Sequence, residues 1–409
     1  MVHRYRIKHA DGPARARGRL TSGSRRQHNG VTPVEPLDLS QTTGAGFRAS
    51  LSDQLVRRGP VVVATSGSTG YPTPVVLSGG ALLASAHAAY EVLGGPGQWL
   101  SALSPTHIGG LQVWVRSLVS GLDPLQMTPH APFTSDAFAD AAQRMRNDQR
   151  RYVSLVPTQI YRLLASATGT ATLASFDRVL IGGAALAPST ASRLTEAGVA
   201  WTHTYGMTET SGGCVYDGIP LRGVRLRTDA ALGVPGRIQI AGPTLAQGYA
   251  DRPDLTADAF VTLEGQRWFK TGDIGIQAAP EPGVAFGRWR VIGRGDDVIN
   301  TGAHKVHPQS VVDALTALDE VSDASVVGVP DAEWGTKVVA MLVENASSSD
   351  TSSLRADPVA WLRSRLRSSL EAYALPAAVT LVGDLPRLRN GKVDTAGVRA
   401  AFIQEDGRI

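Results

Sequence analysis

The chain of 409 residues is poor in cysteine, in lysine and in long apolar runs. Its single cysteine, Cys214, excludes an internal disulfide framework and favours a reducing compartment, which predicts a cytoplasmic protein. No apolar run approaches the ~20 residues that a membrane-spanning helix needs, so we expect no membrane insertion. Lysine supplies only five of the 40 basic side chains, and the rest are arginine. A lysine that is kept in a glycine-rich loop is therefore a candidate functional residue, although genetic drift alone could also leave five lysines.

Positive charge is unevenly distributed along the chain. The formal net charge is +4, but residues 1–30 hold eight lysines and arginines against one acid, Asp11. Such an arm could contact nucleic acid. Glycine, serine and alanine separate its arginines, and it has no apolar pattern. These features favour instead a disordered, solvated tail, or a start codon that was assigned too far upstream. The arm also lacks the apolar segment of a secretory signal. We therefore expect no nucleic-acid partner.

Short apolar runs alternate with amphipathic stretches between residues 60 and 215. Strands are predicted at residues 61–64, 99–103, 152–156 and 179–181, and helices at 80–93, 111–119, 158–165 and 189–197. This alternation favours a parallel sheet covered by helices on both faces. Such sheets bind ligands beyond the carboxyl ends of their strands.

The pattern changes after this segment. Residues 217–290 indicate short strands separated by glycine and proline, and a smaller α/β unit follows Gly293. In that unit we predict helices at 308–318 and 358–370, strands at 324–329 and 338–343, and a polar loop at 347–353. The predicted class is α/β, with a large N-terminal domain of parallel-type sheets and helices plus a β-rich section, and a small mobile C-terminal domain. The predicted limits are 1–30 for the tail, 31–294 for the large domain and 295–409 for the small one.

A glycine- and hydroxyl-rich loop follows the apolar run Val61–Val63. Residues 64–70 read Ala-Thr-Ser-Gly-Ser-Thr-Gly, and position 71 is tyrosine, so the loop is not a Walker A phosphate loop. It is either an ordinary turn after a strand or a nest of N–H and O–H donors able to follow a triphosphate. The loop contains no lysine or arginine. The source of positive charge for a bound nucleotide is therefore open at this point.

Four further motifs follow in order. Glu209 stands among hydroxyl side chains and could hold a hard cation such as magnesium, or be a solvated loop acid. Asp273 ends the stretch Trp-Phe-Lys-Thr-Gly-Asp, which reads as a tight turn and suits a grip on ribose hydroxyls. The stretch 293–297 contains Arg-Gly-Asp, whose likeness to an adhesion motif we interpret as coincidence. Lys392 follows a glycine near the C-terminus and is expected to be exposed by that turn.

Together and in this order, the five motifs resemble those of the adenylate-forming superfamily, which includes acyl-CoA synthetases, nonribosomal-peptide adenylation domains and luciferases. The resemblance spans residues 60–400. Two stretches look more narrowly like the o-succinylbenzoate–CoA ligases of menaquinone synthesis. They are residues 104–113 (SPTHIGGLQV) and residues 205–218 (YGMTETSGGCVYDG).

The resemblance implies a site for ATP and magnesium, with coenzyme A as co-substrate, in an N-terminal AMP-binding domain. The first loop would wrap the phosphates, the Gly182 segment would flank the adenine with Tyr205 stacked on it, and Asp273 and Arg294 would hold the ribose. The implied ATP-binding residues are Thr65, Ser66, Gly67, Ser68, Thr69, Gly70, Gly182, Gly183, Ala184, Tyr205, Gly206, Met207, Asp273 and Arg294.

The same resemblance implies the catalytic and mobile parts. Thr208 and Glu209 would serve the α-phosphate and magnesium, and Lys392 would be the lysine of adenylation. Asp296 would be the hinge about which the small domain rotates, and Gly302 would line the tunnel for pantetheine.

The implied reaction is ATP-dependent ligation of a small carboxylic acid, most closely o-succinylbenzoate, to coenzyme A through an acyl-AMP intermediate. Three alternatives stay open. They are an acyl-CoA synthetase for another small aryl or dicarboxylic acid, a ligase that loads a carrier protein, and a degenerate nucleotide-binding protein. The oligomeric state is also open.

Four features depart from the family pattern or need a second interpretation. The family has lysine and glycine where this chain has Thr73 and Pro74, which leaves the affinity for ATP open. His107 would lie at the acyl pocket by analogy, or would merely cap the helix that follows it. His304 and His307 lack neighbours at metal-binding spacing. We interpret Cys214 as a packing residue, because no base partner for a nucleophile can be assigned.

Overall fold

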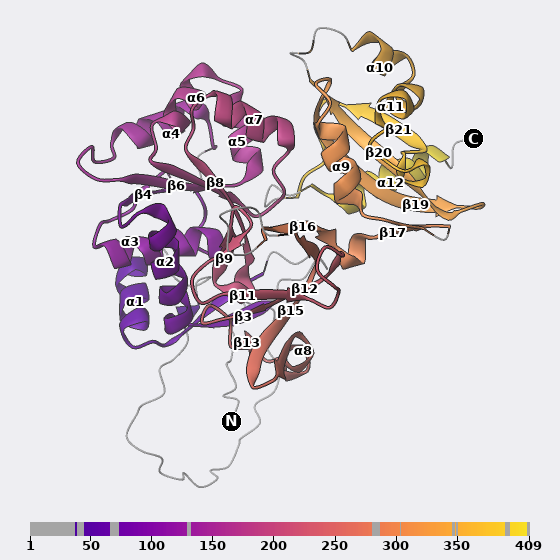
Figure 1. The fold of residues 1–409 in the computed structure, drawn as a ribbon. Coiled ribbons are helices and arrows are strands. Elements are labelled where there is room, and N and C mark those ends of the chain that lie inside the picture. The colour runs from indigo at the N-terminus through magenta and orange to yellow at the C-terminus, as the bar shows by residue number, and fades with distance from the viewer. Residues whose placement is uncertain are drawn as a thin grey trace, which may run out of the picture.

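The computed structural model describes residues 37–38, 45–65, 73–128, 132–279, 287–302, 304–345, 348, 351–388 and 393–406. These residues form a large lobe, followed by a smaller lobe whose core begins at Ile299 (Figure 1). The α/β class and the division into a large and a small part are confirmed. The predicted limits at residues 31 and 295 stay predictions, and residues 1–30 lie outside the described part. None of the described helices is long and apolar enough to span a bilayer.

A seven-stranded sheet with the order β10-β9-β8-β7-β6-β4-β5 forms the centre of the large lobe. Strands β5, β4, β6, β7 and β8 run parallel, β9 is antiparallel to β8, and the edge strand β10 is antiparallel to β9. The strands are β4 (Gln98–Ser101), β5 (Leu125–Gln126), β6 (Arg151–Leu155), β7 (Arg178–Gly182), β8 (Trp201–Met207), β9 (Gly212–Tyr216) and β10 (Ile219–Pro220). The parallel sheet predicted from residues 99 to 181 is therefore confirmed.

Helices cover both faces of this sheet and bury two separate cores (Figure 1). Successive side chains of a strand point to opposite faces, so Trp99 and Tyr152 join one core while Leu100 and Val153 join the other. One face carries α1 (Ala45–Val56), α2 (Gly79–Leu93) and α3 (Ile108–Ser120). The other carries α4 (Ser135–Gln143), α5 (Pro157–Leu164), α6 (Ala167–Ala174) and α7 (Pro188–Glu196).

The strand before the glycine-rich loop does not belong to the parallel sheet, so that expectation was wrong. β2 (Pro60–Ala64) pairs antiparallel with β3 (Pro74–Ser78) in a separate sheet that also holds β1 (Leu37–Asp38) and β13 (Gly248–Tyr249). A parallel return needs a crossover of a dozen or more residues, and the connection from residue 65 to 73 is too short for one. The loop therefore closes a hairpin, and its ends meet where the Thr65 N–H donates to the Thr73 carbonyl.

A third sheet carries the predicted ribose-binding pair. Its strands are β11 (Arg225–Thr228), β12 (Gly236–Ala241), β14 (Phe260–Leu263), β15 (Gln266–Gln277) and β16 (Trp289–Arg294), and α8 (Pro253–Ala259) precedes β14. Asp273 was expected after a tight turn, and this was wrong, because it lies within the long strand β15 opposite Arg294 of β16. The antiparallel pairing of β15 with β16 therefore places the Asp273 carboxylate beside the Arg294 guanidinium.

The small lobe repeats the two-core plan around three strands. The strands are β19 (Val321–Asp331), β20 (Gly335–Glu344) and β21 (Ala378–Val382). They carry one core facing α9 (Pro308–Thr316) and α11 (Pro358–Leu366), and a second facing α12 (Thr395–Asp406). The predicted loop at 347–353 was partly wrong, since α10 begins at Ser352. The other elements are β17 (Ile299–Thr301), β18 (His304–Val306) and α10 (Ser352–Ala356). Short 3₁₀ turns are η1 (Thr208–Thr210), η2 (Gly295–Asp297) and η3 (Ala372–Ala374).

Candidate active site

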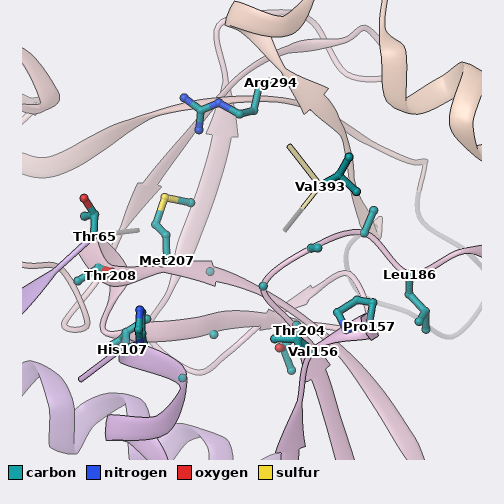
Figure 2. Close-up of a pocket in the computed structure, with 18 of the residues that line it drawn as sticks. Thr65, His107, Val156, Pro157, Leu186, Thr204, Met207, Thr208, Arg294 and Val393 are labelled. Carbon is teal, nitrogen blue, oxygen red and sulfur yellow. The ribbon is translucent and has the colours of Figure 1, made fainter. Parts of the chain in front are cut away.

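A cavity of about 1740 Å³ is lined by residues of both lobes. Residues at the ends of the central strands and of the β2–β3 loop line it from the large lobe, and Val393 lines it from the small lobe. Figure 2 shows His107, Thr65 and Thr208 on one side of the cavity, Pro157 and Leu186 on the other, and Arg294 near the small lobe. Ten of the predicted site residues line the cavity: Thr65, His107, Gly182, Gly183, Ala184, Gly206, Met207, Thr208, Glu209 and Arg294.

The carboxyl ends of β7 and β8 form one wall, and glycine is required there for close packing. A side chain at Gly182 would collide with Thr204 of the neighbouring strand, and one at Gly206 would collide with the Gly212 backbone. Gly183 has φ of +84°, which disfavours any residue with a Cβ. These glycines let the two strand ends approach each other and expose backbone groups to the cavity.

Glu209 is held from both its backbone and its side chain. Its carbonyl accepts the Ala246 N–H at 2.8 Å, and its Oε1 accepts the Tyr249 hydroxyl at 2.9 Å. Burial raises the pKa of the Glu209 carboxyl above its usual value, and Tyr249 acts in the opposite direction by hydrogen bonding to the charged form. Glu209 is therefore an oriented carboxylate at the cavity wall rather than a solvated loop acid.

Tyr205, Asp273 and Arg294 form a connected group. The Tyr205 hydroxyl donates to Asp273 Oδ2 at 2.7 Å, and Arg294 Nη1 lies 3.8 Å from Asp273 Oδ1. Burial and the neighbouring Asp273 carboxylate raise the pKa of Tyr205 well above its usual value, so its hydroxyl keeps its proton. Arg294 lines the cavity, whereas Tyr205 and Asp273 lie beside the lining residues. The stacking of Tyr205 on adenine stays a prediction.

One face of α3 forms another wall. His107 is the N-cap residue of the helix, but its side chain makes no capping hydrogen bond, so only its position fits the capping interpretation. His107 lines the cavity, as do Ile108, Gln112 and Arg116. The last three are spaced four residues apart and therefore share one face of the helix. Arg116 is only 3% exposed, which makes it a buried cation at this wall.

Comparisons with known proteins agree with this arrangement. The profile of the AMP-binding enzymes matches residues 60–250, and that of the AMP-binding enzyme C-terminal domain matches residues 311–392. A probable 2-succinylbenzoate–CoA ligase of Mycobacterium tuberculosis is 41% identical over 345 residues, covering 84% of this chain and 85% of the relative. The chain belongs to the AMP-binding enzyme family.

More distant relatives and solved structures of the family extend this result. A 2-succinylbenzoate–CoA ligase of Enterococcus faecalis is 27% identical, covering 81% of this chain and 67% of its own length. The ATP-bound structure of MatB from Rhodopseudomonas palustris is 25% identical with a TM-score of 0.71, covering 84% of this chain and 68% of that one. The o-succinylbenzoate CoA synthetase of Bacillus subtilis, in complex with its acyl-adenylate intermediate, shares the fold with a TM-score of 0.67, 24% identity and the same coverage.

Six of the predicted site residues lie outside the described part of the chain. They are Ser66, Gly67, Ser68, Thr69, Gly70 and Lys392. The described residues next to them, Thr65 and Val393, line the cavity. Of the two residues that replace the family's lysine and glycine, Thr73 lines the cavity, and Pro74 begins β3.

The hinge and tunnel residues lie away from the cavity wall. The exposed side chain of Asp296 lies in η2, where its Oδ2 is 3.3 Å from Arg294 Nη2. Gly302 joins β17 to β18 with φ of +58°, and its N–H donates to the Trp334 carbonyl. Their roles as hinge and tunnel residues stay predictions.

Cys214, His304 and His307 do not line the cavity. Cys214 is fully buried in the core, and burial raises the pKa of its thiol to about 12, which confirms its packing role. The His304 ring stacks on Tyr373 with centroids 4.0 Å apart. Within the described ranges, no three His, Cys, Asp or Glu side chains are placed to hold a metal by themselves.

Sequence reasoning missed Arg116, Gln112 and Tyr249. The spacing of Gln112 and Arg116 from Ile108 was a usable signal, because it places all three on one helical face. Tyr249 had no such local signal, since its partner Glu209 is 40 residues away in the chain.

Proposed function

We propose that this AMP-binding enzyme is an ATP-dependent acid–CoA ligase that acts on 2-succinylbenzoate. A carboxylate of the acid attacks the α-phosphorus of ATP, giving the acyl-AMP and releasing pyrophosphate. The thiol of coenzyme A then attacks the acyl carbon, giving the thioester and releasing AMP and a proton. The relative with 41% identity carries this activity in its name, and seven of the nine described residues that were predicted to bind ATP line one cavity. Because ATP and coenzyme A are its substrates, we place the protein in the cytoplasm.

The protein's own part in this reaction is positioning and charge stabilisation. We assign the Gly182–Ala184 segment to the adenine and the Asp273–Arg294 pair to the ribose. We assign the β2–β3 loop to the phosphates. Lys392 is the lysine proposed to stabilise the negative charge that develops during adenylation. The small lobe carries Lys392, so its position relative to the large lobe would control this step.

Glu209 fits the role of a magnesium ligand. Magnesium is usually bound by one or two carboxylates together with phosphate oxygens of the substrate. Glu209 offers one carboxylate at the cavity wall with one oxygen already hydrogen-bonded to Tyr249. When bound with ATP, magnesium supplies positive charge to the phosphates. Thr208 is buried beside Glu209 and lines the same wall, which suits its assignment to the α-phosphate.

Arg116 is the observation that carries the choice of acid. 2-Succinylbenzoate has two carboxylates, and the one that is not adenylated keeps its charge and needs a partner when it is buried. The buried Nε of Arg116 has no hydrogen-bond partner among the described residues, and its Nη2 donates to the Tyr216 hydroxyl at 3.1 Å. The guanidinium lies 4.9 Å from the centroid of the Trp99 ring. We assign this cation to the second carboxylate of the substrate.

A substrate panel tests the proposal. Pyrophosphate release is measured for 2-succinylbenzoate, benzoate and a medium-chain fatty acid, with and without coenzyme A. We expect 2-succinylbenzoate to be the best acid, and Arg116→Met to lower kcat/KM for it by about 10- to 100-fold, since a hydrogen bond to a charged group contributes roughly 1.5–3 kcal/mol. The low rate with benzoate, which has no second carboxylate, should not change.

Arg151→Met is the matched control. Arg151 also has a buried Nε without a hydrogen-bond partner in the described part of the chain, and it packs over an aromatic ring, Phe176, but it does not line the cavity. The control should alter stability without altering selectivity. Equal losses on both acids in Arg116→Met would mean that the arginine is structural.

The panel also separates the alternatives. Comparable turnover of benzoate or the fatty acid by the unaltered protein would contradict the assignment of 2-succinylbenzoate. Adenylation that coenzyme A cannot complete would indicate a ligase that loads a carrier protein. Binding of ATP with no pyrophosphate release would indicate a degenerate nucleotide-binding protein.

A further inference from the structure

We propose that Tyr249 is a positioning residue, which holds the Glu209 carboxylate so that its second oxygen faces the cation of metal–ATP. This inference rests on the proposed function, because it assumes that Glu209 meets that cation. Both side chains line the cavity, and the Tyr249 hydroxyl donates to Glu209 Oε1 at 2.9 Å. A carboxylate with one oxygen held in this way presents the other, Oε2, in a defined direction. Hydrogen-bonded partners of metal ligands commonly orient the ligand in this manner.

The backbone around Glu209 is fixed by the same segment that carries Tyr249. The Ala246 N–H donates to the Glu209 carbonyl at 2.8 Å, and the Ser211 hydroxyl donates to the Thr244 carbonyl at 2.8 Å. Gln112 Nε2 donates to the Ser211 carbonyl at 2.8 Å from the other side. The side chain of Glu209 is therefore the freest part of an otherwise clamped turn, and Tyr249 restrains that part.

Tyr249 is itself held firmly enough to act as a support. It lies on β13, which pairs with β3, so its backbone is fixed opposite Val75 in the strand that follows the glycine-rich loop. Its N–H donates to Thr256 Oγ1 at 2.9 Å, and its ring packs against Phe260 with centroids 6.0 Å apart. The residue thus links the Glu209 turn to the hairpin that carries the proposed phosphate loop.

A purely structural role is the competing interpretation. Burying a carboxylate is costly unless it is hydrogen-bonded, so the Tyr249 hydroxyl could serve only to satisfy Glu209. That role would affect folding stability but would leave the binding of a cation beside ATP unchanged. The two interpretations therefore differ in a binding measurement that needs no turnover.

The experiment measures binding of Mn²⁺, used as a spectroscopic substitute for Mg²⁺. The protein is first saturated with an ATP analogue in which a methylene group replaces the oxygen between the α- and β-phosphorus. Electron paramagnetic resonance then follows the free Mn²⁺. We expect Tyr249→Phe to weaken Mn²⁺ binding by about 10- to 100-fold, as is typical when a partner of a metal ligand is removed. Affinity for the metal-free analogue should not change.

Two further variants make the result specific. Tyr161→Phe removes the hydroxyl of another tyrosine that lines the cavity, one for which no hydrogen bond is found among the described residues, and it should bind Mn²⁺ as the unaltered protein does. In a Glu209→Gln background, adding Tyr249→Phe should have no further effect on Mn²⁺ binding, because the oriented carboxylate is already gone.

Either of two outcomes would overturn the proposal. One is unchanged Mn²⁺ binding by Tyr249→Phe, and the other is an effect of equal size in the Glu209→Gln background. The assay contains neither acid nor coenzyme A, so an error in the assigned acyl substrate would not affect it. A protein that fails to bind the ATP analogue at all would instead contradict the proposed function.

Discussion

At the scale of single residues, the cations around the cavity come from widely separated parts of the chain. Arg116 of α3, Lys270 of β15 and Arg294 of β16 all line the cavity. Arg294 is within ion-pair distance of Asp273 and Asp296. The glycine-rich loop has no basic residue, and Thr73 stands where the family resemblance implies a lysine. The charge that adenylation requires must therefore come from other elements than this loop.

Lys392→Ala should slow acyl-AMP formation by about 10²–10³-fold, the usual loss when one preorganised donor is removed. Thioester formation from supplied acyl-AMP and coenzyme A should be largely spared, because we assign this lysine to the first step alone. Lys392→Arg should restore little of the lost rate of acyl-AMP formation, because the planar guanidinium group of arginine is not a compact point charge like the lysine ammonium. Rapid-quench measurement of each half-reaction checks these expectations.

Lys270→Ala is the comparison for that prediction. Lys270 lines the cavity and is the other lysine among the sequence motifs. Normal adenylation by Lys392→Ala, together with slow adenylation by Lys270→Ala, would show that β15 supplies the charge and that the role given to Lys392 is wrong.

At the scale of elements, the connection between the lobes runs through η2. Residues of a 3₁₀ turn have φ between about −50° and −70°, and proline has φ near −65°, so proline is compatible with the Asp296 position in this conformation. Val393, which is bonded to Lys392, lines the cavity here. We therefore interpret the present arrangement as the one that serves adenylation.

Asp296→Pro should consequently preserve acyl-AMP formation and slow the transfer to coenzyme A, because the fixed φ hinders rotation of the small lobe. Asp296→Ala, which removes the same carboxylate but leaves φ free, should perform both half-reactions. Single-turnover assays of each step in the two variants provide the measurement. Equal losses in both half-reactions of the proline variant, with the melting temperature intact, would argue against a hinge at this residue.

At the scale of the whole molecule, the sequence pattern of residues 1–30 predicts that the fold does not depend on them. Among the described residues, the hydrophobic clusters begin at Leu37, and the first 30 residues, which lie outside that part, are basic with no apolar periodicity. A protein that starts at Val31 should therefore keep both its melting temperature and its kcat. Thermal denaturation and steady-state assays of the two lengths check this. A clear drop in either value would mean that the arm packs against the enzyme or takes part in its reaction.

The sequence by itself determined the alternation of strands and helices in the central parallel sheet, the α/β class and the family, because these depend on short-range periodicity and on contiguous motifs. Tertiary structure decided what depends on residues far apart in the chain. The β2 run was apolar enough for a parallel sheet, yet its partner is the adjacent run at Pro74–Ser78. Arg116 meets Tyr216 one hundred residues away, and Tyr205 meets Asp273 across 68 residues. Such contacts depend on how sheets and helices pack, which no local pattern specifies.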